Sequence, residues 1–159
     1  MKRIFTLSVL VLVVATAASV ALAARSGGPG HGQKQHGKAI LVVEHATTDA
    51  ITNPPGGASA VVCDVLTFAN DVFDKSNKTK VGHDQGYCVR LIVGESWECV
   101  WTTFFSRGQI TVEGPFYDTK DSVLAITGGT GAYARTRGSM ELKARPGGTE
   151  FDFIFHLNH

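Results

Sequence analysis

The stretch Glu150-Phe-Asp-Phe-Ile-Phe-His-Leu157 alternates large apolar side chains with other residues. Its three phenylalanines and Leu157 fall at every second position. Because successive side chains of a strand point to opposite faces, this period of two predicts a β-strand with one buried, aromatic face. The rest of the chain is expected to supply partners for this strand.

Seven other segments carry similar short apolar or alternating runs. They are 39–47, 60–68, 87–93, 97–105, 109–116, 122–127 and 138–143. Turn-forming sequences such as Asn53-Pro-Pro-Gly-Gly57 and Pro146-Gly-Gly148 separate them. Eight short strands in one small domain predict an all-β fold, either a closed antiparallel barrel or a sandwich. The interior of an eight-stranded barrel is filled by side chains or holds one small ligand.

The N-terminal segment predicts secretion. Lys2 and Arg3 precede an apolar run at 4–20, and Ala21-Leu-Ala23 supplies the small residues that signal peptidase reads. The run is short for a bilayer span and no positive cluster follows it, so a signal peptide at 1–23 is favoured over a membrane anchor. The Gly-, Ser-, Gln- and His-rich segment 24–38 is expected to be a flexible lead-in to a single domain at 39–159. We therefore expect an extracellular or periplasmic protein with no membrane contact after cleavage.

Charge and motifs exclude several classes of partner. Loss of the two N-terminal positive charges takes the formal net charge from +1 to −1, and no Lys/Arg run occurs, so no nucleic-acid partner is expected. Gly129-Thr-Gly-Ala-Tyr-Ala134 formally matches a dinucleotide fingerprint, but a strand follows it instead of the required helix, so no cofactor is expected. His31 and His36 lie in the lead-in, where solvated side chains are the usual case, and no metal is predicted.

Several motifs together resemble the allene oxide cyclase family of plants. They are Val112-Glu-Gly-Pro-Phe-Tyr117, Asp121-Ser-Val-Leu-Ala-Ile-Thr-Gly-Gly-Thr-Gly-Ala-Tyr133, Lys80-Val-Gly-His-Asp-Gln-Gly-Tyr-Cys-Val89 and the closing segment 149–157. The resemblance covers nearly the whole chain after the lead-in. It implies an eight-stranded antiparallel barrel with an elongated apolar cavity, assembled as a homotrimer. Dirigent proteins belong to the wider superfamily, and Thr130 and Arg137-Gly138 look more like theirs.

The resemblance implies catalytic roles for two residues. Glu44 matches a glutamate that stabilises positive charge as an epoxide opens, and Asn70 matches an asparagine that fixes a water on the epoxide oxygen. Ala46 stands where the family has a second asparagine, so that water-holding network loses a member. Periodicity allows either face of this strand to be buried, and the resemblance favours an inward Glu44 with a raised pKa.

The resemblance also implies ligand-binding residues. Phe68 and Cys88 match residues that line the cavity, and Pro54 or Pro55 lies near a proline that contacts the water. Arg90 shares a strand face with Cys88. If that face is the lumen, Arg90 could anchor a ligand carboxylate through paired hydrogen bonds, and otherwise it is a surface residue.

Cys88 has an alternative as one half of a disulfide. Cys99 lies on the next predicted strand, and secreted proteins oxidise their cysteines, so a Cys88–Cys99 bridge is favoured. The two face each other if the hairpin loop has an even count, such as 92–95. A three-residue loop at 94–96 would put Leu91 opposite Cys99 instead. With the bridge formed, Cys63 is expected to be a buried spectator.

Three functions follow as expectations, all with a small hydrophobic ligand. The first is an isomerase or cyclase of the allene oxide cyclase type, acting on an unsaturated epoxide of the oxylipin class. The second is a dirigent-like protein that guides stereoselective coupling of phenoxy radicals without doing the oxidation. The third is a binding barrel without turnover.

Overall fold

The computed structural model describes residues 38–52 and 61–158, which form ten strands and one short 3-10 helix. The elements are β1 (Lys38–His45), β2 (Ala50–Thr52), β3 (Val65–Phe68), β4 (Asp71–Asp74), β5 (Lys80–Ile92), β6 (Ser96–Phe105), β7 (Gly108–Tyr117), β8 (Ser122–Gly129), η1 (Gly131–Tyr133), β9 (Arg137–Ala144) and β10 (Glu150–Asn158). The predicted signal peptide (1–23), the lead-in up to residue 37, Pro54 and Pro55 lie outside the described residues. No helix in the described ranges is long and apolar enough to cross a membrane.

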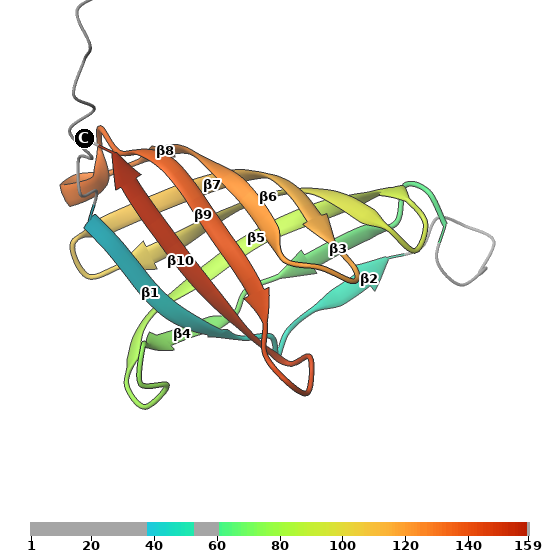
Figure 1. The fold of residues 1–159 in the computed structure, drawn as a ribbon, viewed down its shortest axis with the longest axis horizontal. Coiled ribbons are helices and arrows are strands. Elements are labelled where there is room, and N and C mark those ends of the chain that lie inside the picture. Colours follow the sequence, from blue (N-terminus) through green and yellow to red (C-terminus); the bar gives the residue numbers. More distant parts are fainter. Residues whose placement is uncertain (1–37, 53–60, 159) are drawn as a thin grey trace, which may run out of the picture. The chain divides into compact units, whose positions relative to one another are not determined.

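The strands close into an antiparallel barrel (Figure 1). From β1 the hydrogen-bonded order runs through β10, β9, β8, β7 and β6 to β5. One edge of β5 pairs with β6, and its other edge pairs with β4 and then β3, which act as one interrupted strand. β1 pairs with β4 and β2 with β3, so β1 and β2 form a second interrupted strand and complete the ring. The all-β prediction of an eight-stranded antiparallel barrel is confirmed.

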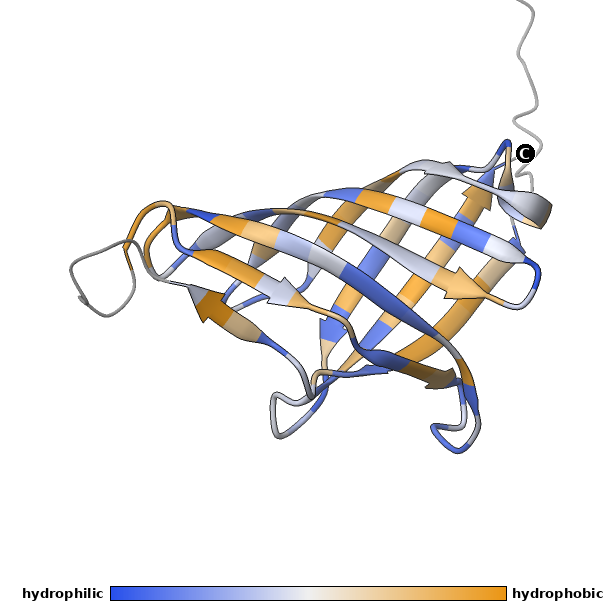
Figure 2. Ribbon diagram, turned by 180° about the vertical axis from the view of Figure 1, so that it is seen from behind, coloured by the Kyte–Doolittle hydropathy of each residue, from blue (hydrophilic) through white to orange (hydrophobic). Residues whose placement is uncertain are grey.

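The aromatic face of β10 points into this barrel, as its sequence pattern predicts. Phe153, Phe155 and Leu157 are essentially inaccessible to solvent. Alternate residues of the neighbouring strands complete the core, and apolar and polar colours alternate along several strands in Figure 2. Inner residues of these strands include Val42, Val72, Trp97, Trp101, Ile110, Val112, Leu124, Ile126, Met140 and Leu142.

Strands β3 and β5 differ from their sequence-based prediction. The segment expected at 60–68 is a strand only from Val65, and the strand expected at 87–93 begins at Lys80. Gly82 and Gly86 interrupt the apolar pattern there. A Cβ on Gly82 would lie 2.0 Å from the carbonyl oxygen of Phe104, and one on Gly86 would lie 2.2 Å from Cβ of Trp101. Close approach of β6 therefore explains glycines that by propensity argue against a strand.

The β5–β6 hairpin brings Cys88 opposite Cys99, and the two form a disulfide. The loop at 93–95 has an odd count, unlike the even loop that the pairing was expected to need. A bulge between Arg90 and Ile92 adds one residue to the β5 side and restores the register. Cys63 is exposed, in a surface turn closed by a hydrogen bond from Asp64 N–H to the Val61 carbonyl, so the expectation of a buried Cys63 was wrong.

Candidate functional site

Glu44 lies on the inner face of β1. It is 6% exposed, and Val42 on the same face is buried in the core. Its side chain lines a cavity of about 40 Å³ inside the barrel. Asp49 also lines this cavity, and the remaining walls are apolar and include Leu66, Phe68 and Trp101. The carboxyl group therefore lies in an environment that is poor in water.

Asn70 holds this carboxyl group in place. It is 1% exposed and sits at the break between β3 and β4. Its Nδ2 donates to Glu44 Oε1 at 2.9 Å and to Asp49 Oδ1 at 2.8 Å. Its Oδ1 accepts three hydrogen bonds of 3.0 Å, from Thr47 N–H, Thr48 N–H and the Thr48 hydroxyl.

Both amide hydrogens of Asn70 are thus already used, and neither is left for a water. These hydrogen bonds fix Glu44 and the turn that follows β1, and the water-holding role that the resemblance implies for Asn70 stays a prediction. Ala46 brings no polar side chain to this cluster, whereas Asp49 in the same turn does.

Asp84 is a member of the cluster that the sequence analysis missed. It lies on β5, is fully buried and shares the inner face with Gly86 and Cys88. Its Oδ1 accepts the backbone N–H of Asn70 at 3.2 Å, and its Oδ2 has no hydrogen-bond donor. The backbones of Asp84 and Asn70 also exchange two hydrogen bonds, of 3.1 and 2.8 Å.

Burial raises the pKa of both inner acids. Desolvation is the main reason that the pKa of Glu44 lies well above its ordinary value, and the negative charge of Asp84 adds to it. Desolvation likewise raises the pKa of Asp84 to about 7. No ion pair among the described residues includes either acid. The pair therefore retains a proton under conditions in which exposed carboxyl groups are ionised.

The cavity side chains expected from the resemblance take different positions. Phe68 lines the cavity and packs edge-on against Trp101, with ring centroids 5.9 Å apart. Cys88 also lines the cavity, but as half of the disulfide with Cys99, so it offers no thiol there. Trp101 lines the same cavity, and its buried Nε1–H has no hydrogen-bond partner.

Arg90 points to the inner side of the wall but already has an anionic partner. Its guanidinium binds the Asp118 carboxylate and stacks on the ring of Trp97, 3.7 Å from the centroid. Trp97 Nε1 donates to the same carboxylate at 3.0 Å. Arg90 does not line the inner cavity, so anchoring a ligand carboxylate would require Asp118 to be displaced.

A larger hollow lies next to the inner cavity. This cleft has a volume of about 450 Å³ and shares Phe116, Leu142 and Phe151 with the inner cavity. Its remaining wall includes Tyr117 at the end of β7, the loop at 118–121 and Gly148 from the β9–β10 turn. Phe116 and Phe151 meet edge to face, with centroids 6.2 Å apart. The cleft has the size of a small-molecule site, whereas the inner cavity alone does not.

Within residues 38–52 and 61–158, no group of three or more side chains is arranged to hold a metal ion. His31 and His36, the histidines of the lead-in, lie outside the described residues.

Solved structures with the same fold have several activities. A structure titled pyocyanin demethylase matches with a TM-score of 0.67 and 22% identity, over 76% of this chain and all of that one. The pterocarpan synthase dirigent protein PsPTS1 matches with a TM-score of 0.62 and 19% identity, over 80% of this chain and 99% of its own. The Diels-Alderase AbmU from Streptomyces koyangensis matches with a TM-score of 0.55 and 14% identity, over 79% of this chain and 71% of its own.

At these identities the solved structures support the barrel fold and leave the chemistry open. The family model described as allene oxide cyclase matches residues 41–158, which includes nearly all of the barrel. The protein belongs to the allene oxide cyclase family.

Proposed function

We propose that the protein is secreted and binds a small apolar ligand in its barrel, where it isomerises an unsaturated epoxide of the oxylipin class. The observation that carries this proposal is the buried Glu44 carboxyl group, fixed by Asn70 on the wall of a largely apolar cavity. Buried acids with raised pKa values in a cavity are typical of functional sites.

The arrangement suits the opening of an epoxide. As the C–O bond breaks, negative charge develops on oxygen and positive charge on the carbon chain. A fixed carboxyl group in a water-poor site interacts strongly with such charges, because little solvent screens them. The rigid walls, among them Phe68 and Trp101, then restrict the chain to one conformation, and this restriction sets the stereochemistry of ring closure.

In this proposal the ligand occupies both the inner cavity and the neighbouring cleft. The inner cavity of about 40 Å³ has room for only a few atoms, since one water needs about 10–15 Å³. We place the reacting oxygen there, next to Glu44. The rest of the apolar ligand extends past Phe116 and Phe151 into the cleft.

The test supplies freshly generated allene oxide and measures the enantiomeric excess of the cyclopentenone product. The wild type should give one enantiomer in excess. Glu44→Gln should lower the rate of the catalysed reaction by about 100-fold or more, the usual contribution of a group that handles a proton or charge. Glu113→Gln, an exposed acid on β7, is the matched control and should behave as the wild type. A racemic product at high wild-type concentration would contradict the proposal.

The dirigent alternative rests on Thr130, Arg137 and Gly138, to which the structure gives local roles. A Cβ on Gly138 would lie 2.0 Å from the carbonyl oxygen of His156, so packing alone requires a glycine there. Arg137 donates to the Thr136 carbonyl, and Thr130 N–H binds the Gln109 carbonyl. We therefore favour the isomerase. Coupling of coniferyl alcohol with an external oxidase tests the alternative, and we expect no stereochemical bias from the protein.

A further inference from the structure

We infer that Asp84 is a positioning residue that keeps the carboxyl proton on Glu44, so that Glu44 presents an O–H group to an oxygen atom of the ligand. The inference rests on the proposed function for the nature of the ligand, and it narrows the class to neutral molecules with an acceptor oxygen, such as an epoxide or a carbonyl.

The hydrogen-bond count around the two acids carries the inference. Asn70 gives one side-chain hydrogen to Glu44 and its backbone hydrogen to Asp84, and nothing donates to Asp84 Oδ2. A fully buried carboxylate oxygen without a donor is costly. Two ionised carboxylates cannot supply one another with a donor. One proton between Glu44 and Asp84 turns their contact into a hydrogen bond. This hydrogen bond raises the pKa of Glu44 and lowers the pKa of Asp84.

The surroundings of the pair favour retention of that proton. The other acids that act on it are Asp49, in the turn after β1, and Asp71 on β4, whose carboxylate is paired at the surface with Lys80 at 2.6 Å. On β6, Asp84 faces Thr103, whose buried hydroxyl group has no hydrogen-bond partner.

On β10, Glu44 faces Phe151, which does not titrate. No lysine, arginine or histidine of the described residues forms an ion pair with Glu44 or Asp84. The environment is therefore acidic and apolar, and a shared proton is the one source of neutralisation within the pair.

The retained proton gives the proposed reaction a balanced course. When the ligand binds, the Glu44 O–H turns from Asp84 to the ligand oxygen. As the epoxide C–O bond breaks, the proton passes to that oxygen, and Glu44 becomes a carboxylate beside the cationic carbon chain. Ring closure forms one C–C bond. The O–H proton then returns to Glu44 as the carbonyl forms, so no electrons are gained or lost and no co-reactant is consumed.

The first experiment follows the side-chain carboxyl carbons by NMR during a pH titration of the folded, ligand-free protein. In the wild type, Glu44 should titrate well above the ordinary range of glutamate. Asp84→Asn keeps the acceptor for Asn70 but removes the negative charge, so it should lower the pKa of Glu44 while burial still holds it above ordinary. Asp49→Asn is the matched comparison. Asp49 is exposed and contributes less to the pKa of Glu44, so this variant should lower it less.

A Glu44 that titrates in the ordinary range in the wild type would overturn the inference, even if Asp84→Asn failed to fold. An unchanged Glu44 pKa in a folded Asp84→Asn variant would overturn it as well. A residue with a purely structural role would alter stability without moving this pKa.

The second experiment measures stereoselective turnover of allene oxide, from the enantiomeric excess of the cyclopentenone product, as a function of pH. Turnover by the wild type should fall as pH rises through the pKa of Glu44, and the midpoint should move to lower pH in Asp84→Asn. Stereoselective turnover combined with an ordinary Glu44 titration would overturn the inference and leave the proposed function standing. A raised Glu44 pKa with a racemic product would overturn the proposed function and leave the shared proton standing.

Discussion

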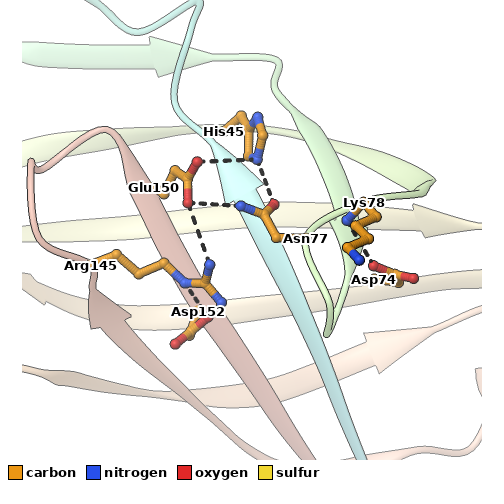
Figure 3. A network of polar contacts seen from close by, with 7 residues as sticks. All are labelled: His45, Asp74, Asn77, Lys78, Arg145, Glu150 and Asp152. Carbon is orange, nitrogen blue, oxygen red and sulfur yellow. Dashed lines mark hydrogen bonds and ion pairs between the residues drawn. The ribbon is translucent and has the colours of Figure 1, made fainter.

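The two faces of β1 carry polar networks of opposite composition. On the outer face, His45 Nε2 contacts Asn77 Oδ1 at 2.7 Å, and Asn77 Nδ2 donates to Glu150 at 3.0 Å (Figure 3). Arg145 then bridges Glu150 at 3.4 Å and Asp152 at 2.8 Å. The acids of this network thus have a cation beside them and are partly exposed to solvent.

On the inner face, one residue earlier in the chain, Glu44 meets Asn70 and Asp84 with no cation in the cluster. Compensated, half-exposed charges are the usual composition of a structural surface network. Uncompensated buried acids cost stability, and proteins keep such groups mainly where they bind or react with something. This contrast between adjacent residues supports the proposed site on the inner face of β1.

The largest stability effect should come from the covalent bridge in the inner wall. Replacing both Cys88 and Cys99 by alanine should lower the free energy of unfolding by about 3 kcal/mol, because the bridge restricts the unfolded chain across a separation of 11 residues. Urea denaturation of the oxidised protein, the thiol-reduced protein and the double variant measures this loss in the free energy of unfolding. Equal midpoints for the oxidised and reduced wild type would show that hydrogen bonding alone holds this wall.

The next effect is the pH dependence that the inner acids impose on stability. Because folding raises their pKa values, the folded state binds more protons than the unfolded state, for Asp84 between about pH 4 and about pH 7 and for Glu44 from about pH 4 up to its raised pKa. The contribution of these groups to the free energy of unfolding is therefore highest at low pH and falls as pH rises. The fall is up to about 1.4 kcal/mol for each unit by which folding raises a pKa.

Comparison of the wild type with Glu44→Gln and Asp84→Asn isolates this contribution. Asp74 and Glu141, whose pKa values are lowered by hydrogen bonds, act in the opposite direction but are common to all three proteins. Urea denaturation at several pH values should give a flatter pH profile for each variant than for the wild type. Parallel profiles would mean that the inner acids ionise normally.

Sequence reasoning reached the barrel because β10 and most of the strands from β6 to β9 carry a local alternating pattern. It missed β4 and the first half of β5, where polar residues and glycines dominate. The need for Gly82 and Gly86 comes from the approach of β6, a contact between strands that no local pattern records. A strand was thus predictable where alternating side chains pack into the core. It was not predictable where glycines allow a close approach between neighbouring strands.

The same distinction applies to the site. Resemblance suggested Glu44, Asn70 and Phe68 as site residues, whereas Asp84 was missed because its burial depends on strands brought beside it by closure of the barrel. Alternation from Cys88 places Arg90 on the inner side, but its partner Asp118 lies 28 residues away in a turn. Partners that come from distant loops determine whether such a charge is available to a ligand, and a single sequence does not reveal them.

The smallest expected effect belongs to the outer network. Arg145→Gln removes its central cation, but Arg145, Glu150 and Asp152 retain 28%, 34% and 26% of their side-chain exposure. Water therefore solvates the carboxylates that lose their partner, and the free energy of unfolding should fall by less than about 1 kcal/mol.

Salt separates this effect from that of the inner pair. Urea denaturation at low and high salt should show the Arg145→Gln difference shrinking as salt screens the exposed charges. The difference between wild type and Asp84→Asn at neutral pH should persist, because ions do not reach that buried pair. A loss of several kcal/mol in Arg145→Gln, independent of salt, would mean that the outer network supports the barrel as strongly as its interior does, and the contrast between the two faces of β1 would no longer indicate where function lies.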